Sequence, residues 1–266
     1  MTAEIVERVL RSSRYRDVDH SLLSRLAAEE LRRARNTDEA VKRVKRRLHQ
    51  AVGAFRGERR ADSLGLIRAA WTGDMTDASF RAACAEELAM HASSRERLPH
   101  LDAFYSGIWK HTGLPARLLD IGCGLNPLAL PWMGLGDATY VATDVDQRPL
   151  GTVRAFVDLV GQPGEVRAGD AVADPLTDEA DVALLLKLVT TLDRQEPGAA
   201  SRLLHALRVR HAVLSFPART LGGRGIGMER TYRGRLERLV ADCPRVIAVA
   251  EASVPNELVF VLTLDG

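Results

Sequence analysis

Cysteine is scarce in this sequence, and its three copies, Cys84, Cys123 and Cys243, stand far apart. An odd number of widely spaced cysteines supports neither a disulfide framework nor a four-ligand zinc motif. The seven histidines likewise show no spacing typical of paired metal ligands. The sequence therefore predicts no metal site, and the cysteine content favours a reducing, cytoplasmic compartment.

Long apolar segments are also lacking. No apolar run approaches the roughly 20 residues that a membrane-spanning helix needs. The first ten residues already contain Glu4, Glu7 and Arg8, which is unlike a signal peptide. We expect a monomer without membrane association. Of the 266 residues, 46% are hydrophobic, which is enough for one sizeable domain and a smaller one.

Charge is small in total but unevenly distributed. The net charge is +2, yet residues 1–60 hold 16 Lys and Arg against 9 Asp and Glu, whereas the remainder holds 21 against 26. This asymmetry indicates that the N-terminal part of the chain contacts a polyanion. A solvated helical surface would give the same composition, so that interpretation stays open here.

The N-terminal part carries helical patterns, of which the best defined begins near Asn36. Asn36 can cap this helix, with Glu39 as its capping-box partner. Apolar residues recur every three or four positions along one face: Val41, Val44, Leu48, Val52 and Phe55. The rest of the surface carries five cations in six positions: Lys42, Arg43, Lys45, Arg46 and Arg47. We predict that these cations bind the phosphate backbone of an RNA.

Two further helices are expected over residues 75–90 and 101–109. Beyond these helices, apolar strand patterns begin to alternate with helical ones. This change places a domain boundary near residue 100. We therefore expect a basic, all-α N-terminal domain over residues 1–100 and a catalytic domain over residues 101–266.

The second domain is organised around the stretch LLDIGCGLNP, from Leu118 to Pro127. A short apolar run, an acid and two glycines are typical of a buried parallel strand that ends in a tight turn. Gly122 would let the backbone turn and a ligand approach closely. A dinucleotide fingerprint is not matched, because its third glycine would fall at Pro127. An acid just before Gly-x-Gly instead resembles the first motif of methyltransferases that use S-adenosylmethionine (SAM).

A second acid lies at the distance that a nucleoside site requires. Residues 139–144 are expected to form the neighbouring strand, and its last residue, Asp144, follows Gly122 by 22 positions. A carboxylate about 20 residues past a glycine turn can accept hydrogen bonds from both ribose hydroxyls. The two motifs together predict a nucleoside-binding site.

Beyond these motifs, apolar runs alternate with helical patterns. Strands are expected at residues 117–121, 140–143, 165–168, 181–186, 212–216, 246–250 and 258–264. Helices fit after the first, second, fourth and fifth of them, which predicts an α/β fold with a parallel, doubly wound sheet. The short gap before the last strand favours an antiparallel hairpin that closes a seven-stranded, Rossmann-like sheet, as class I methyltransferases have.

Four stretches together resemble the aminoglycoside-resistance 16S rRNA (guanine-N7) methyltransferases of the Arm/Rmt type. They are residues 91–98 (HASSRERL), 119–133 (LDIGCGLNPLALPWM), 183–192 (ALLLKLVTTL) and 215–228 (SFPARTLGGRGIGM). The resemblance implies methyl transfer from SAM, leaving S-adenosylhomocysteine (SAH), to N7 of one decoding-centre guanine in the 16S rRNA of the small ribosomal subunit. It also implies resistance to 4,6-linked deoxystreptamine aminoglycosides such as gentamicin and kanamycin.

The resemblance further implies which residues bind the cofactor. Arg97 would pair with the SAM carboxylate through a bidentate, charge-assisted contact. Asp144 would bind the ribose, and Asp170 would accept from the adenine amino group, with the backbone N–H of Ala171 beside it. The other expected cofactor contacts are Phe55, His91, Ala92, Ser93, Gly122, Leu186 and Gln195.

On the target side, Lys187 ends an apolar strand and is expected to point into the crevice. We interpret it as a polar positioning group, because guanine N7 has a lone pair and no proton for a base to remove. Alignment of N7, methyl carbon and sulfur would supply most of the catalysis. The glycine-rich stretch 220–227 is expected to order over RNA, with Arg219 and Arg224 on phosphates and Met228 on a flipped base.

Three alternatives remain at this stage. Methylation of adenine N1 at the same decoding site would need aromatic clamps, and no suitable pair of tryptophans is evident beyond Trp132. A non-catalytic RNA-binding protein with a vestigial SAM pocket is disfavoured by intact Arg97, Asp144 and Asp170. A small-molecule methyltransferase is disfavoured by the basic helical region.

Overall fold

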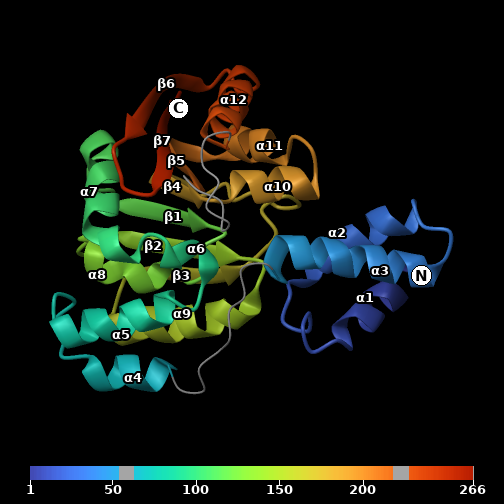
Figure 1. Cartoon of the computed structure of the whole chain (residues 1–266), viewed down its shortest axis with the longest axis horizontal. Coiled ribbons are helices and arrows are strands. Elements are labelled where there is room, and N and C mark those ends of the chain that lie inside the picture. Colours follow the sequence, from blue (N-terminus) through green and yellow to red (C-terminus); the bar gives the residue numbers. More distant parts are fainter. Residues whose placement is uncertain (54–62, 218–227, 266) are drawn as a thin grey trace.

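The computed structural model describes residues 1–53, 63–217 and 228–265, and the described residues form one central seven-stranded sheet (Figure 1). The strand order is β3-β2-β1-β4-β5-β7-β6. The strands are β1 (Arg117–Ile121), β2 (Thr139–Asp144), β3 (Gly164–Ala168), β4 (Glu179–Leu186), β5 (Arg208–Pro217), β6 (Val246–Ala252) and β7 (Glu257–Leu264). The first five are parallel to one another, and β7 is antiparallel to both β5 and β6.

All seven predicted strands and the closing hairpin are confirmed. The observed strands extend the predicted ranges by a few residues at one or both ends, except for β1, which matches its range. The hairpin also reverses the order of its strands, because β7 inserts between β5 and the edge strand β6. Sequence spacing alone predicts that the last two strands pair, but not which of them joins the rest of the sheet.

Helices cover both faces of the sheet (Figure 1). They are α7 (Leu101–Thr112), α8 (Leu130–Met133), α9 (Gln147–Val160), α10 (Val189–Gln195), α11 (Ala199–Ala206) and α12 (Met228–Ala241), with the 3-10 turn η3 (Asn126–Ala129) before α8. The helices predicted after the first, second, fourth and fifth strands are therefore confirmed. None of the helices in the described part of the chain combines the length and the apolar character that a membrane crossing needs.

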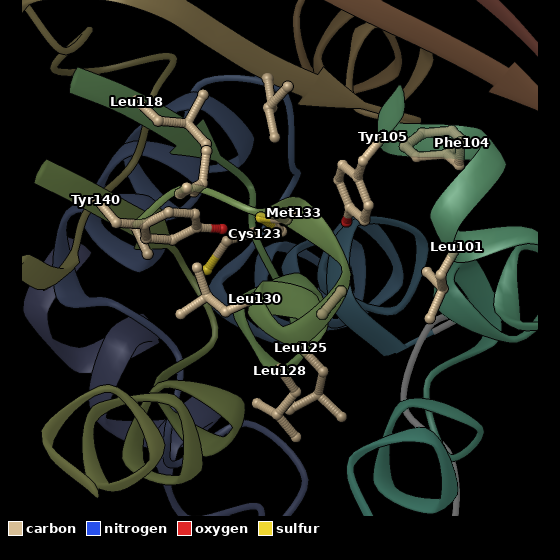
Figure 2. Close-up of a cluster of buried hydrophobic side chains, with 14 of the residues drawn as sticks. Leu101, Phe104, Tyr105, Leu118, Cys123, Leu125, Leu128, Leu130, Met133 and Tyr140 are labelled. Carbon is tan, nitrogen blue, oxygen red and sulfur yellow. The ribbon is translucent and has the colours of Figure 1, made fainter. Parts of the chain in front are cut away.

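Alternation along the strands sends neighbouring side chains into two different apolar clusters. Leu118 joins the cluster with α7, α8 and α9, and Leu119 joins the cluster with α10, α11 and α12. Figure 2 shows the first cluster, in which Tyr105 and Tyr140 approach the turn that follows β1. The sheet is thus buried on both faces, which leaves its carboxyl edge as the place for a ligand.

The described elements before residue 101 are all helical. They are α1 (Thr2–Leu10), α2 (His20–Leu31), α3 (Thr37–Leu48), η1 (His49–Gly53), α4 (Ser63–Ala70), α5 (Ala78–Leu88), α6 (Ala92–Arg95) and η2 (Leu98–His100). In Figure 1, α1, α2 and α3 lie together beside the carboxyl ends of the parallel strands. They share an apolar cluster of their own, whereas Phe80 and Cys84 of α5 pack into the cluster on the sheet.

Helical periodicity could not reveal this division, because it shows which face is apolar and not what that face packs against. The apolar clusters divide between η1 and α4 rather than near residue 100. This division does not favour a boundary near residue 100, and a separate all-α domain over residues 1–100 stays a prediction.

The predicted cap of α3 is confirmed, since Asn36 Oδ1 accepts the backbone N–H of Glu39 at 2.9 Å. The reciprocal contact differs, because the Glu39 carboxylate accepts from the N–H of Arg35 at 2.9 Å. The apolar face continues past the end of α3 into η1, where Val52 is buried. Phe55, predicted on the same face, lies outside the described residues.

Candidate functional site

A cavity opens at the carboxyl ends of β1, β2 and β4. The strand order reverses between β1 and β4, and open α/β sheets bind ligands at such a switch point. The hollow encloses about 770 Å³ of space, part of it open to solvent. Many of the predicted site residues line it: His91, Ser93, Gly122, Asp144, Asp170, Ala171, Leu186, Lys187 and Gln195. Ala92 opens α6 between two of them.

Part of the cavity wall was not predicted. Ala51 and Val52 of η1 line it from the N-terminal helices, and Thr191 and Leu192 line it from α10. No motif marks Ala51 and Val52, so only their position in the fold reveals them. Thr191 and Leu192 end the stretch 183–192, which was a signal for them in the sequence. Gly124 also lines the cavity, and the second glycine of the turn was a signal for it in the sequence.

The predicted glycine turn is confirmed at the floor of the cavity. Gly122 has φ of +67° and Gly124 has φ of +52°, a region that side chains disfavour. A Cβ on Gly122 would lie 2.7 Å from Cδ1 of Leu188, and a Cβ on Gly124 would lie 2.9 Å from Cε1 of His91. Both positions therefore favour glycine for their backbone conformation, and a side chain at either would also have to displace the end of the Leu188 or His91 side chain.

Asp144 ends β2 with its carboxylate at the cavity wall. One oxygen accepts the N–H of Gly124 and the other accepts the N–H of Asp146, each at 2.8 Å. Burial raises the pKa of Asp144 to about 6; the two backbone hydrogen bonds oppose the shift, and nearby Asp146 and Asp120 add to it. The carboxylate is thus fixed in orientation, and each oxygen keeps a lone pair for a ligand.

Asp170 follows β3 and is 2% exposed. Its Oδ1 accepts the N–H of Val172 at 3.0 Å, and its Oδ2 accepts Nε of Arg25, on α2, at 2.8 Å. The predicted acid of the site is therefore present in the wall, and the N-terminal helices provide its cationic partner.

Arg97 does not line the cavity. Its Nε and Nη2 donate to the two carboxylate oxygens of Glu257 at 2.9 and 3.1 Å, and its Nη1 donates to Oδ1 of Asn126 at 3.0 Å. A buried guanidinium needs a carboxylate, and β7 supplies it in this structure. The pairing of Arg97 with a SAM carboxylate stays a prediction, which this arrangement does not favour. Sequence reasoning missed Glu257, because it stands 160 positions away.

Lys187 follows β4 with φ of +57° and lines the cavity. Its Nζ donates to the carbonyl of Ser93 at 2.9 Å and to Glu96 at 2.6 Å, and Glu257 lies 3.3 Å away. An ammonium that faces two carboxylates is a donor and not a proton acceptor. The arrangement therefore suits a positioning group rather than a general base.

The comparisons with known proteins agree with this geometry. A family model described as "Ribosomal RNA methyltransferase (FmrO)" matches residues 11–261. The chain belongs to this family of ribosomal RNA methyltransferases. The predicted family and the predicted class I methyltransferase fold are thereby confirmed.

Several relatives and solved structures match nearly the whole chain, among them the following three. A 16S rRNA (guanine(1405)-N(7))-methyltransferase of Micromonospora echinospora is 37% identical over 265 residues, which is 97% of this chain and 95% of the relative. A protein of the same name from Frankia casuarinae is 39% identical over 262 residues, 96% of this chain and 91% of the relative. The structure of the 16S rRNA methyltransferase RmtF in complex with SAH superposes with a TM-score of 0.80 at 33% identity, covering 99% and 98% of the chains.

In this rRNA methyltransferase, the cations of α3 do not all face solvent. Lys42 and Arg46 are exposed and Lys45 is half-buried, but Arg43 pairs with Glu39 at 2.8 Å. The Arg47 side chain is only 14% exposed, and it pairs with carboxylates of α2 and donates to the carbonyl of Gln195. The binding of RNA phosphate by Arg47 stays a prediction, which this arrangement does not favour, because its helical position turns it toward α2 and the end of α10.

The predicted target-side residues are described only in part. Arg219, Arg224 and the stretch 220–227 lie outside the described residues. Met228 is the first residue of α12 and is half-buried against the apolar cluster of α10, α11 and α12. Its contact with a flipped base stays a prediction.

Proposed function

We propose that the chain transfers the methyl group of SAM to N7 of a decoding-centre guanine in the 16S rRNA of the small ribosomal subunit. We further propose that this methylation confers resistance to 4,6-linked deoxystreptamine aminoglycosides such as gentamicin and kanamycin. The main support for this function is the cavity at the switch point of the sheet, where the glycine turn and Asp144 meet, in a chain of the FmrO family. Relatives that match along nearly the whole chain carry the guanine-N7 name.

The cavity fits the chemical groups of SAM, which supplies a methyl group activated by a sulfonium. The methionine end would lie against the backbone of Gly122, which lines the cavity without a side chain of its own. Asp144 would accept both ribose hydroxyls through its two fixed oxygens. Asp170 and the N–H of Ala171 would bind the adenine edge, with Leu186 and Leu192 as apolar neighbours.

The residues at the mouth of the cavity suit a reaction without a general base. Guanine N7 attacks with its lone pair, so the protein has to align nitrogen, methyl carbon and sulfur and exclude water. His91 lies in the wall, and burial lowers its pKa to about 4. It is therefore neutral near pH 7, which avoids a second positive charge beside the sulfonium. Lys187 would orient the segment around Ser93 through their hydrogen bond.

The ionisation of Asp144 should control cofactor affinity. Its pKa is raised to about 6, so the apo protein holds a proton there below that pH and a carboxylate above it. Because the carboxylate is the better acceptor for ribose hydroxyls, SAH affinity should be constant above about pH 7. It should fall by about tenfold per pH unit below about pH 6, as linkage to one proton requires. Calorimetry between pH 5 and 8 measures this profile.

Asp144→Asn is the control for that profile. The variant should bind SAH more weakly at neutral pH and should lose the decline near pH 6, since the amide does not titrate. His91 should not contribute in this range, because its pKa lies near 4. A wild-type profile that stays flat from pH 8 to pH 5 would remove the Asp144 carboxylate from the ribose site.

Expression in a susceptible bacterium tests the reaction itself. Resistance to gentamicin and kanamycin with unchanged susceptibility to apramycin is the expected pattern, and borohydride–aniline cleavage of the 16S rRNA should locate an N7-methylguanine. Resistance that includes apramycin, with a reverse-transcription stop at the neighbouring adenine, would instead support adenine-N1 methylation. The Asp144→Ala variant is the inactive control. Failure of the wild-type protein to bind SAH would support a vestigial pocket.

A further inference from the structure

Two arginines of the N-terminal helices contact the wall of the cofactor cavity. Arg25 of α2 donates from Nε to Asp170 at 2.8 Å and from Nη2 to the side-chain oxygen of Gln195 at 3.0 Å. Arg47 of α3 donates to the backbone carbonyl of the same Gln195. Asp170 and Gln195 both line the cavity, one after β3 and the other at the end of α10. Figure 1 shows α2 and α3 beside these segments.

Asp170 depends on such a partner. Its side chain is 2% exposed, and a buried carboxylate is costly unless a positive charge and hydrogen bonds compensate for lost water. Val172 supplies one backbone N–H, and Arg25 supplies the charge. Each oxygen of Asp170 has two acceptor sites, so both contacts leave room for a ligand donor.

Arg25 is itself held in place by carboxylates. Glu29 lies 3.3 Å from its Nη1, and Glu196 lies 3.7 Å from the same nitrogen. Glu29 also pairs with Arg47 at 2.6 Å, so one carboxylate joins the two arginines. Arg25 is only 14% exposed, and its planar fork reaches two cavity residues at once, which a lysine could not do.

We propose that Arg25 is a positioning residue of the cofactor site, acting through Asp170 and Gln195. This proposal rests on the proposed function in one respect, namely that the cavity binds SAM with its adenine at Asp170. Arg25 holds the Asp170 carboxylate in the orientation in which a free lone pair faces the adenine amino group. Arg47 supports this arrangement by fixing the backbone of Gln195 and the carboxylate of Glu29. The N-terminal helices are thereby a required part of the cofactor site.

Calorimetry with SAH on the full chain tests the proposal. Arg25→Ala should weaken SAH binding by about tenfold or more, the size expected for a charge-assisted hydrogen-bond network. Arg25→Lys should recover only part of the loss. Arg11→Ala is the matched control, because Arg11 is exposed and pairs only with the exposed Glu7 of α1 in the described contacts; it should bind like the wild type. If Arg25→Ala fails to fold, SAH binding is measured on Arg25→Gln and Arg25→Lys instead. Circular dichroism checks that these variants are folded.

A double-mutant cycle separates positioning from general stabilisation. Arg25→Ala combined with Asp170→Asn should bind SAH about as weakly as the weaker single variant, since the two residues act as a unit. The preference for SAH over S-inosyl-L-homocysteine, which lacks the adenine amino group, should also shrink in Arg25→Ala. With ribosomal subunits as substrate, KM for SAM should rise while kcat at saturating SAM stays near the wild-type value.

Three results would overturn the assignment. They are wild-type SAH affinity in Arg25→Ala, single-variant losses of affinity that multiply in the double variant, and equal weakening of SAH and S-inosyl-L-homocysteine binding in Arg25→Ala. Absence of SAH binding by the wild-type protein is a different failure, because it overturns the proposed function of the pocket. Wild-type binding with an unaffected Arg25→Ala variant overturns this inference alone.

Discussion

Gly122→Ala should abolish most SAH binding and all measurable methylation. A Cβ at this position would lie 2.7 Å from Cδ1 and 3.3 Å from Cδ2 of Leu188, which also lines the cavity. The backbone φ of +67° adds a penalty of about 1–2 kcal/mol for any residue with a side chain. The Leu188 side chain would have to shift within the cavity wall and intrude on the cofactor space, so we expect affinity to fall by about a hundredfold or more. Calorimetry with SAH and methylation of purified subunits measure both effects.

Gly134→Ala is a matched control for the backbone penalty. Gly134 ends α8 with φ of +65°, and a Cβ there would meet nothing within 4 Å. This variant should lose a similar amount of stability and should keep wild-type SAH affinity. Comparable melting temperatures with a large difference in affinity would locate the effect in the cavity. Tight SAH binding by Gly122→Ala would show that the cofactor does not approach this turn.

Reversal of two exposed charges on α3 should separate docking from cofactor binding. Lys42 and Arg46 lie one turn apart and are exposed, whereas Arg43 and Arg47 are held in ion pairs. Lys42→Glu with Arg46→Glu should weaken binding to the small ribosomal subunit by about tenfold or more. The slope of log affinity against log salt should decrease by about 1.4 to 1.8, for two lost phosphate contacts. SAH affinity should not change.

The matched control places the same charge reversals elsewhere. Arg208 and Arg210 are exposed at the start of β5, at the edge of the sheet opposite the cavity. Arg208→Glu with Arg210→Glu should leave subunit binding and its salt dependence close to those of the wild type. If the two double variants weaken binding equally, the attraction is nonspecific. If Lys42→Glu with Arg46→Glu has no effect, α3 does not face the ribosome.

The strands, the glycine turn and the placement of Asp144 could be predicted because they depend on near neighbours in the chain. Apolar runs bounded by turn residues indicate buried strands, and a strand that ends in Gly-x-Gly must turn there. The 22-residue interval to Asp144 spans one strand–helix–strand unit, so the parallel sheet brings both ends together. The same logic predicted that Lys187 would reach this edge, whereas Asp170 and Leu186 were implied by the family resemblance.

The partners of the buried charges could not be predicted in this way. Arg97 pairs with Glu257 across 160 positions, and Arg25 pairs with Asp170 across 145. Residue type shows that each buried cation needs a carboxylate but not which of the 35 acidic residues supplies it. The pattern of α3 likewise could not distinguish Arg46, which faces solvent, from Arg47, which faces Gln195.

By itself the sequence determined the order of the secondary-structure elements, the sheet with its closing hairpin, and the motifs at its carboxyl edge. These features follow from side-chain periodicity and backbone sterics, which act over a few residues. Only the tertiary structure decided that β7 inserts beside β5 and that Ala51 and Val52 complete the cavity wall. It also decided that α2 supplies Arg25 to Asp170. Such contacts depend on how apolar faces pack, and packing brings together residues whose separation in the chain carries no signal.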